Sequence, residues 1–159
     1  MNNQLKEKND KTKLALKKAN NFISYRPRST TEVENKLALM FDEDIVENVV
    51  NNLKKEKLLD DLKFAKLWVT SRTLSNQKSE NYIRYELEQK GISSSNINIA
   101  LSEIDNDENA YNAGFKKIRS LSNLPKKLIE KKLESFLRRK GFNISTTRLA
   151  IKKLTEKNI

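Results

Sequence analysis

Apolar residues recur along this chain at the spacing of amphipathic helices. The pattern is clearest in two segments, which carry Ile97, Ala100, Leu101 and Ile104, and Ile129, Leu133, Phe136 and Leu137. Because residues three and four apart share one face of a helix, each segment predicts a helix that buries one side. The 159 residues include 3 Gly and 2 Pro, too few for the turns of a sheet-rich fold. The sequence therefore predicts an all-α protein.

The helical pattern repeats along the chain. Gly91 and Gly141 each follow a helical segment, and glycine just past a helix can adopt the left-handed conformation that ends it. A cluster of Ser and Thr follows each glycine, at 93–95 and 145–147, and its hydroxyls can cap the next helix. An earlier copy is weaker: it opens with the capping-box sequence STTE at 29–32, and Met40 stands where the later copies have glycine.

Each copy also has a leading helix, expected near 12–25, 60–75 and 107–121. We therefore predict three tandem three-helix units, at 12–57, 58–106 and 107–159, the last of them basic. Such units bury one face against the next and stack into an elongated, curved array. Residues 1–11 show no apolar period and are expected to form a flexible N-terminal arm.

Composition argues against an enzyme. The chain has no His and no Cys, and it has no glycine-rich phosphate loop. Asp105, Asp107 and Glu108 lie at a predicted unit junction and are expected to cap a helix rather than bind a metal, so we predict neither cofactor nor metal. The absence of Cys, of a signal-like N-terminus and of a bilayer-length apolar segment predicts a cytoplasmic protein without membrane contact.

The net charge of +11 is concentrated at the two ends of the chain. Residues 123–159 contain 11 Lys or Arg and 3 acidic residues, a net charge of +8, whereas the middle is almost neutral. This end either is a solvated surface or contacts a polyanion such as DNA. The candidate contact residues are Lys126, Lys127, Lys131, Lys132, Arg138, Arg139, Arg148 and Lys152. Lysines at the start of a helix favour phosphate contact over base reading, so any DNA contact should be independent of sequence.

Residues 58–72, LLDDLKFAKLWVTSR, form the most informative segment. Asp60 and Asp61 suit the start of a helix, where a carboxylate can cap free N–H groups. The apolar members are expected to form the joint between the first two units: Leu58, Leu59, Phe64, Ala65, Trp68 and Val69. We expect Phe64 and Trp68 to face the third helix of the preceding unit. Arg72 lies one turn after Trp68, so its guanidinium can either cover the indole or reach a partner.

This segment, with two others, resembles the signature of the RecX family, whose members modulate the RecA recombinase. Residues 25–29, YRPRS, resemble the family's upstream Arg-Pro-Arg-Ser segment, and residues 86–92, ELEQKGI, resemble its downstream Leu-x-Gln-Lys-Gly-Ile segment. The resemblance implies a non-enzymatic, all-α module of three units that lies along the groove of the RecA–DNA filament. It also implies regulation of DNA repair and recombination, usually by inhibition.

The candidates for contact with RecA are Asp60, Asp61, Arg72, Tyr82, Arg84 and Tyr85. The two tyrosines share one side of a predicted helix, and they either stack on a protein or DNA surface or pack on the neighbouring unit. We expect a monomer. Two alternatives remain open: an autonomous, sequence-independent DNA-binding helical protein, suggested by the basic end, and an adaptor for another protein, suggested by the repeats alone.

Overall fold

The computed structural model describes residues 2–75 and 77–158, and every regular element within these ranges is a helix. The elements are α1 (Asn2–Ser24), α2 (Thr30–Ala38), α3 (Glu43–Lys55), α4 (Asp61–Leu74), α5 (Glu80–Gln89), α6 (Ser94–Leu101), α7 (Asn106–Ile118), the 3-10 helix η1 (Arg119–Leu121), α8 (Lys126–Arg139) and α9 (Ile144–Asn158). None of these helices combines the length and the apolar character needed to cross a bilayer.

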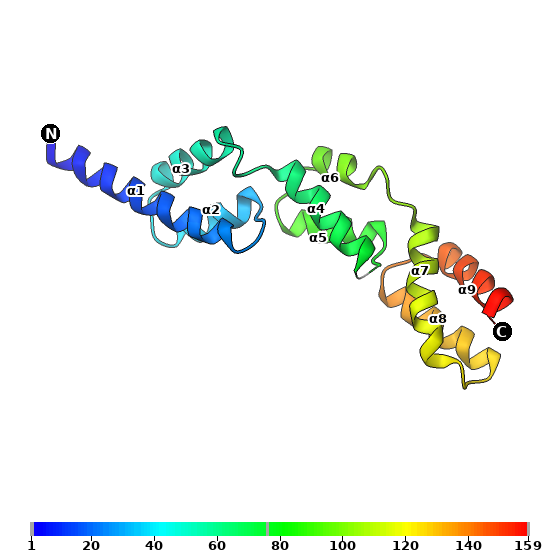
Figure 1. Ribbon diagram of the computed structural model, residues 1–159. Coiled ribbons are helices and arrows are strands. Elements are labelled where there is room, and N and C mark those ends of the chain that lie inside the picture. The colour runs from blue at the N-terminus through cyan, green and yellow to red at the C-terminus, as the bar shows by residue number, and fades with distance from the viewer. Residues whose placement is uncertain (1, 76, 159) are drawn as a thin grey trace.

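The helices group in threes, and the three groups follow one another as an elongated, bent body (Figure 1). We call α1–α3 unit 1, α4–α6 unit 2 and α7–α9 unit 3. Each unit has its own buried apolar core, which includes Leu37 and Leu53 in unit 1, Ile83 and Leu87 in unit 2, and Leu133 in unit 3. The predicted all-α array of three-helix units is confirmed. The residue boundaries of the units stay a prediction.

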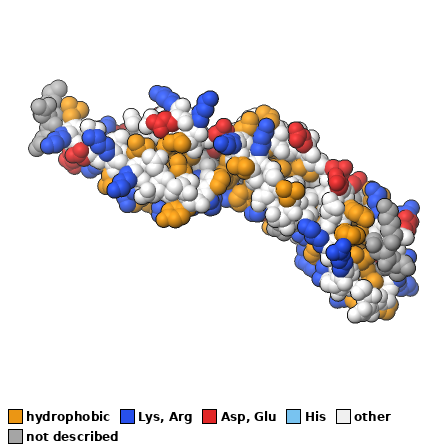
Figure 2. All heavy atoms as spheres, in the orientation of Figure 1, with side chains coloured by type: hydrophobic (Ala, Val, Ile, Leu, Met, Phe, Trp, Pro, Cys, Tyr) orange, Lys and Arg blue, Asp and Glu red, His pale blue; other side chains and the backbone are white. Residues whose placement is uncertain are grey.

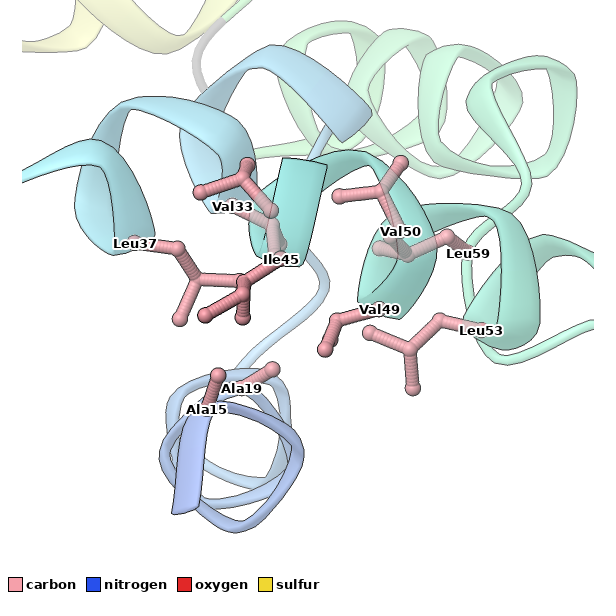
Figure 3. Close-up of a cluster of buried hydrophobic side chains, with 10 residues drawn as sticks. Ala15, Ala19, Val33, Leu37, Ile45, Val49, Val50, Leu53 and Leu59 are labelled. Atoms are coloured by element: carbon pink, nitrogen blue, oxygen red, sulfur yellow. The ribbon is translucent and has the colours of Figure 1, made fainter. Parts of the chain in front are cut away.

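Unit 1 illustrates how the sequence pattern builds a core. Ala15 and Ala19 on α1 turn toward the side chains of α3, among them Ile45 and Val49 (Figure 3). Both alanines are fully buried, and their small side chains allow α1 to lie close to its neighbours. Leu59, just after α3, is also part of this core. The core of unit 1 therefore extends into the connection to α4.

The helix ends follow the predicted caps with one exception. The Ser29 hydroxyl accepts from the Glu32 N–H at 3.2 Å, and the Glu32 carboxylate accepts from the Ser29 N–H at 3.1 Å, which completes the capping box. Gly91 and Gly141 both have a left-handed backbone, with φ of 73° and 92°. The exception is α9, which begins before the 145–147 cluster. Its first turn is capped by Asn143, whose side-chain oxygen accepts from the Thr146 N–H at 2.8 Å.

The N-terminal segment differs from the expectation. We predicted a flexible arm over residues 1–11, but residues 2–11 are the first turns of α1, and residue 1 lies outside the described residues. Residues 4–11 are exposed and add nothing to the core. Two ion pairs support this part of the helix: Lys11 pairs with Glu7 at 2.9 Å one turn away, and Lys8 pairs with Asp44 of α3. A pattern of apolar residues cannot predict such ion pairs.

Candidate functional site

The contact between units 1 and 2, which we call joint 1, uses the acidic residues of the 58–72 segment. Asp60 caps α4 by accepting from the Lys63 N–H at 2.9 Å. Asp61 reaches across the joint, where its carboxylate accepts from the N–H of Thr30, the first residue of α2, at 2.8 Å. Both carboxylates therefore satisfy helix N-termini, a structural role.

Joint 1 also contains a cluster of charges around Glu32. Its carboxylate pairs with Arg26 at 2.7 Å, with Arg28 at 3.6 Å and with Lys90 of unit 2 at 3.6 Å. Burial alone would raise the pKa of Glu32, but the hydrogen bonds from Arg26 and the Ser29 N–H, together with the charge of Lys90, hold this pKa below its ordinary value of 4.5. The YRPRS segment and residues 86–92, ELEQKGI, which we call the Lys-Gly segment, therefore meet at the carboxylate of Glu32.

The lowered pKa makes joint 1 sensitive to acid. Ionised Glu32 stabilises the fold above its ordinary pKa, and this contribution is lost as the pH falls through the lower folded-state pKa. We expect Glu32→Gln, which keeps the capping-box hydrogen bond, to reduce the free energy of unfolding by about 1 kcal/mol near neutral pH. Urea unfolding near pH 7 and at a series of pH values below 4.5 checks this. The difference between variant and wild type should shrink as the pH falls below 4.5, and a difference that stays constant would contradict the charge-based account.

The aromatic residues of the 58–72 segment face their own unit. Phe64 and Trp68 stack with ring centres 5.7 Å apart, and Phe64 packs in the core of unit 2. The expectation that they face α3 is wrong, because α4 buries this stripe against α5 and α6. The Arg72 guanidinium lies 4.2 Å from the Trp68 ring centre and donates to Glu86 at 2.6 Å. Since the Trp68 indole N–H also donates to Glu86, at 2.8 Å, Arg72 is held inward.

Leu58 is a second correction. We expected it to close joint 1 beside Leu59, but 51% of Leu58 is exposed, whereas Leu59 is buried. Lys57 takes a left-handed backbone with φ of 57°, and this turn leaves Leu58 outside the core. The other apolar members, Phe64, Ala65 and Val69, are buried, and Trp68 is half-buried.

Leu58 instead borders an open cleft between the end of α1 and the start of α4. Tyr25, 86% exposed, and Leu67, 47% exposed, share this cleft with it. Arg26, Lys57 and Lys63 also line the cleft, and Asp60 is the acidic member. We call this surface, defined by Tyr25, Leu58 and Leu67, the apolar cleft. Exposed aromatic and leucine side chains with a cationic rim are typical of a protein-binding surface.

The three candidate contact residues on α5 differ in how far they are available to a partner. Arg84 is engaged within unit 2, donating to Asn98 at 2.8 Å and pairing with Glu80 at 3.6 Å. Tyr82 is half-buried beside Gly141 of unit 3, which favours packing on the neighbouring unit. Tyr85 is 59% exposed and stays available to a partner.

The contact between units 2 and 3, which we call joint 2, repeats the design of joint 1. The Glu80 N–H, first in α5, donates to the side-chain oxygen of Asn106 at 2.9 Å, as Thr30 does to Asp61. The Ser79 N–H donates to the Lys140 carbonyl at 3.2 Å, and Ser29 likewise donates its hydroxyl to the Lys90 carbonyl at 2.7 Å. Thr30 and Ser29 correspond to Glu80 and Ser79, and Lys90 corresponds to Lys140, each 50 residues later, whereas Asp61 corresponds to Asn106, 45 residues later.

Basic residues of unit 3 line two grooves, one on either side of α8. The groove between α8 and α9 mixes charges: Lys126, Lys127, Lys131, Arg148 and Lys152 line it together with Glu130, Glu134 and Glu156. The groove between α7 and α8 is lined by Lys117, Lys131, Lys132 and Arg139 without an acidic residue. We call the second one the basic groove. Carboxylates weaken the attraction of nearby cations for a polyanion. The basic groove should therefore attract a polyanion more strongly than the groove between α8 and α9. Figure 2 shows Lys and Arg side chains gathered over unit 3 and where it meets unit 2.

The two ends of α8 are fixed by Pro125 and Arg138. Pro125 precedes the helix as its N-cap residue. Arg138 donates to the Phe142 carbonyl at 2.9 Å and thereby helps to end the helix. Arg138 is exposed like Lys132 and Arg139, but this bond engages its guanidinium and makes it less suited to contact DNA.

The comparisons with known proteins agree on one family. The model of the first three-helix domain of RecX matches residues 15–53, and that of its second three-helix domain matches residues 60–101. A regulatory protein RecX from Prosthecochloris aestuarii is 33% identical over 144 residues, which cover 90% of this chain and 95% of that protein. The chain belongs to the RecX family. A regulatory protein RecX from Clostridioides difficile is 34% identical, over 88% of this chain and 68% of that protein.

Solved RecX structures share the fold. The crystal structure of RecX from Lactobacillus salivarius matches with a TM-score of 0.78 and 25% identity, covering 92% of this chain and 98% of that one. A second crystal structure of regulatory protein RecX gives 0.75 and 28%, over 92% and 74%. The resemblance to RecX is thus confirmed, and with it a regulatory role.

Sequence reasoning missed several residues of this RecX chain that the fold places at its surfaces. Tyr25 and Leu67 belong to the apolar cleft. At joint 2, partial burial lowers the pKa of Lys140, and repulsion from Lys78 and Lys116 lowers it further. A residue-by-residue comparison of the repeats would have singled out Lys78 and Lys140, because they stand 50 residues after Arg28 and Lys90.

Proposed function

We propose that this chain binds the RecA recombinase and its filament on DNA, and that it limits strand exchange there. The proposal rests on membership in the RecX family and on one observation. The elongated body carries two chemically different surfaces, the apolar cleft at joint 1 and the basic groove on unit 3. A nucleoprotein filament offers a partner for both, because it contains both protein and DNA phosphates.

In this proposal the apolar cleft meets protein and the basic groove lies near the DNA phosphates. Aromatic and aliphatic side chains contribute most to protein interfaces when they enter a pocket, and cations at the rim select the partner. Asp60 and Asp61 cap helices, and Arg72 is bonded to Glu86. In this proposal they support the cleft rather than contact the partner, and Asp61 does so by linking the two units.

The direct test is a titration of the protein into RecA-coated single-stranded DNA, with ATP hydrolysis and strand exchange measured together. Both activities should fall at protein concentrations equal to or below that of RecA. The absence of any response would contradict the recombinase proposal and favour an adaptor for another protein.

A pair of leucine variants tests the apolar cleft within the same assay. Leu58→Ser removes an apolar side chain from the cleft, whereas Leu39→Ser changes a leucine that is 79% exposed at the end of α2, outside the cleft. We expect Leu58→Ser to weaken filament binding about tenfold, the cost of losing a well-placed interface residue. Leu39→Ser should bind like the wild type. Equal effects of the two variants would remove the cleft from the mechanism.

The basic groove also favours a second candidate function, autonomous DNA binding without sequence preference. Its four cations lie together without a carboxylate. A salt titration of binding to bare DNA tests it, because phosphate contacts make affinity fall steeply with salt concentration. The absence of binding at low salt would leave the groove as a solvated surface.

A further inference from the structure

An open groove lies where unit 2 meets unit 3, between α4, α6 and the start of α7. Leu74 and Ile99 line it and are 70% and 51% exposed, and Glu103, Asp105 and Glu108 give it a negative charge. We call this surface, defined by these five residues, the acidic groove. On a chain with a net charge of +11 it has the opposite sign, and acidic side chains are visible where the two units meet (Figure 2).

Two carboxylates of the acidic groove are open to a partner. Asp105 is used within the chain, where it caps α7 by accepting from the N–H groups of Asp107 and Glu108 at 2.9 and 3.0 Å. The side chains of Glu103 and Glu108 are exposed, and neither forms an ion pair among the described residues. No group of three or more acidic side chains in the described part of the chain is placed to hold a metal ion. The groove therefore suits a cationic segment of a protein.

The first turns of α1 have the complementary chemistry. Residues 4–11 are exposed and lie outside the core of unit 1. Leu5, 64% exposed, precedes Leu16 by about three helical turns, so it continues the apolar side of α1 beyond that core. Lys6 and Lys13 are exposed, and within the described ranges neither pairs with a carboxylate. This segment is therefore a projecting cationic helix with an unburied leucine.

We propose that the acidic groove of one copy of this chain binds the first turns of α1 of a second copy. In this contact, Leu5 packs beside the exposed apolar side chains of the groove, and Lys6 and Lys13 face its two open carboxylates. A helix laid in an apolar groove is a common mode of protein recognition, and charges at the rim select the partner. The contact joins two copies because α1 begins at one end of the elongated body, away from the groove between units 2 and 3 (Figure 1).

The contact is head-to-tail rather than symmetric. A pair formed in this way keeps one unoccupied groove and one free α1, so further copies can add to either end as an open chain or a closed ring. Each contact is small, so we expect a weak association and a monomer when the protein is dilute. The inference goes beyond the proposed function, and it is tested on the protein alone, without RecA or DNA.

Sedimentation equilibrium of the full chain at about 10 µM to 1 mM measures this association. The average mass should rise with protein concentration. Added salt should reduce the rise, because the paired charges are exposed and are screened. A chain that stays monomeric at about 1 mM would overturn the proposal.

Two charge reversals each remove one side of the contact. Glu103→Lys with Glu108→Lys changes the groove and raises the net charge by four, whereas Lys6→Glu with Lys13→Glu changes α1 and lowers it by four. Each variant should associate at least about tenfold more weakly than the wild type. Opposite effects of the two variants would overturn the proposal, because net charge alone would then govern the association.

The matched control, Glu47→Lys with Glu88→Lys, makes the same change in net charge as the groove variant at exposed positions on α3 and α5. It should associate more tightly than the groove variant, and equal losses would overturn the proposal. Circular dichroism and thermal unfolding verify that each variant is folded.

A chain that carries the groove and α1 reversals together provides a rescue test. Its charges are exchanged between the two sides and its net charge equals that of the wild type. Association should return toward the wild-type strength. A folded chain with all four substitutions that stays as weak as the groove variant would overturn the pairing of α1 with the groove.

Cross-linking of the unmodified chain locates the contact. A carbodiimide joins a lysine to a carboxylate that touches it, and a mixture of isotope-labelled and unlabelled protein identifies the links that form between copies. Such links should connect Lys6 or Lys13 to Glu103 or Glu108. Links between copies that involve only other residues would overturn the proposal.

Discussion

Replacing Gly91 with alanine is expected to lower the free energy of unfolding by about 2–4 kcal/mol and to uncouple units 1 and 2. The φ of 73° at Gly91 costs an alanine about 1 kcal/mol. A Cβ there would also lie 2.6 Å from the Cβ of Thr31, in α2 of the other unit. Relieving that overlap moves backbone against backbone, which adds about 1–3 kcal/mol.

The chain offers a matched control for the conformational part of this effect. Lys57 already holds a left-handed backbone, with φ of 57°, at an exposed position. Lys57→Gly therefore removes only the cost of holding an L-residue in this conformation, and it should raise the free energy of unfolding by up to about 1 kcal/mol. A loss of only about 1 kcal/mol for Gly91→Ala would mean that strain alone acts and that the joint can relax.

Urea unfolding followed at two probes measures both parts of the prediction. Trp68, the single tryptophan of the chain, reports on unit 2. Amide hydrogen exchange of the core of unit 1 reports on its neighbour. Stacked units unfold together only while the interface between them is intact. The wild type should therefore lose both signals at similar urea concentrations, and Gly91→Ala should separate them.

Much of the fold could be predicted because helix periodicity and helix ends are local properties. The capping box at Ser29 and the glycine stops at 91 and 141 depend on residues a few positions apart, and the structure confirms them. The cap of α9 was misplaced because Asn143 competes with three hydroxyl residues nearby, and the choice depends on where the helix begins. The first turns of α1 were missed because exposed helical residues leave no apolar pattern.

The site was harder to predict because the neighbours that a side chain faces depend on the tertiary structure. The spacing of Phe64 and Trp68 predicted a stripe correctly, but it could not tell which neighbours would cover it. The sequence does not show which partners Asp61 and Arg72 bind. Asp61 accepts from the N–H of Thr30, 31 residues away, and Arg72 donates to Glu86, 14 residues away. Leu58 has the composition of a core residue, and one left-handed residue before it leaves it exposed.

The signature segments contribute residues both to joint 1 and to the apolar cleft. YRPRS, the 58–72 segment and the Lys-Gly segment supply Arg26, Asp61 and Lys90, which meet at joint 1. Their shared task is to fix the angle between two units. Tyr25 of YRPRS and Leu67 of the 58–72 segment take no part in these contacts; their side chains are exposed and line the apolar cleft.

Reversing two charges in the basic groove is expected to reduce filament binding about 100-fold at low salt. Lys132→Glu with Arg139→Glu cancels the four positive charges that line this groove. Both side chains are exposed, so the fold should be retained. The loss should shrink as salt is added, because phosphate contacts release counterions and carry most of the salt dependence.

The control reverses two other charges on the same helix. Lys126→Glu with Lys127→Glu makes the same change in net charge, but in the groove that already contains Glu130, Glu134 and Glu156. Because those carboxylates weaken the attraction for phosphate, we expect this variant to lose less than tenfold. Arg138 is left unchanged in both variants, since its bond to the Phe142 carbonyl would confound binding with stability. A larger loss for the control would place the polyanion between α8 and α9, and equal losses would make net charge, rather than a groove, the determinant of binding.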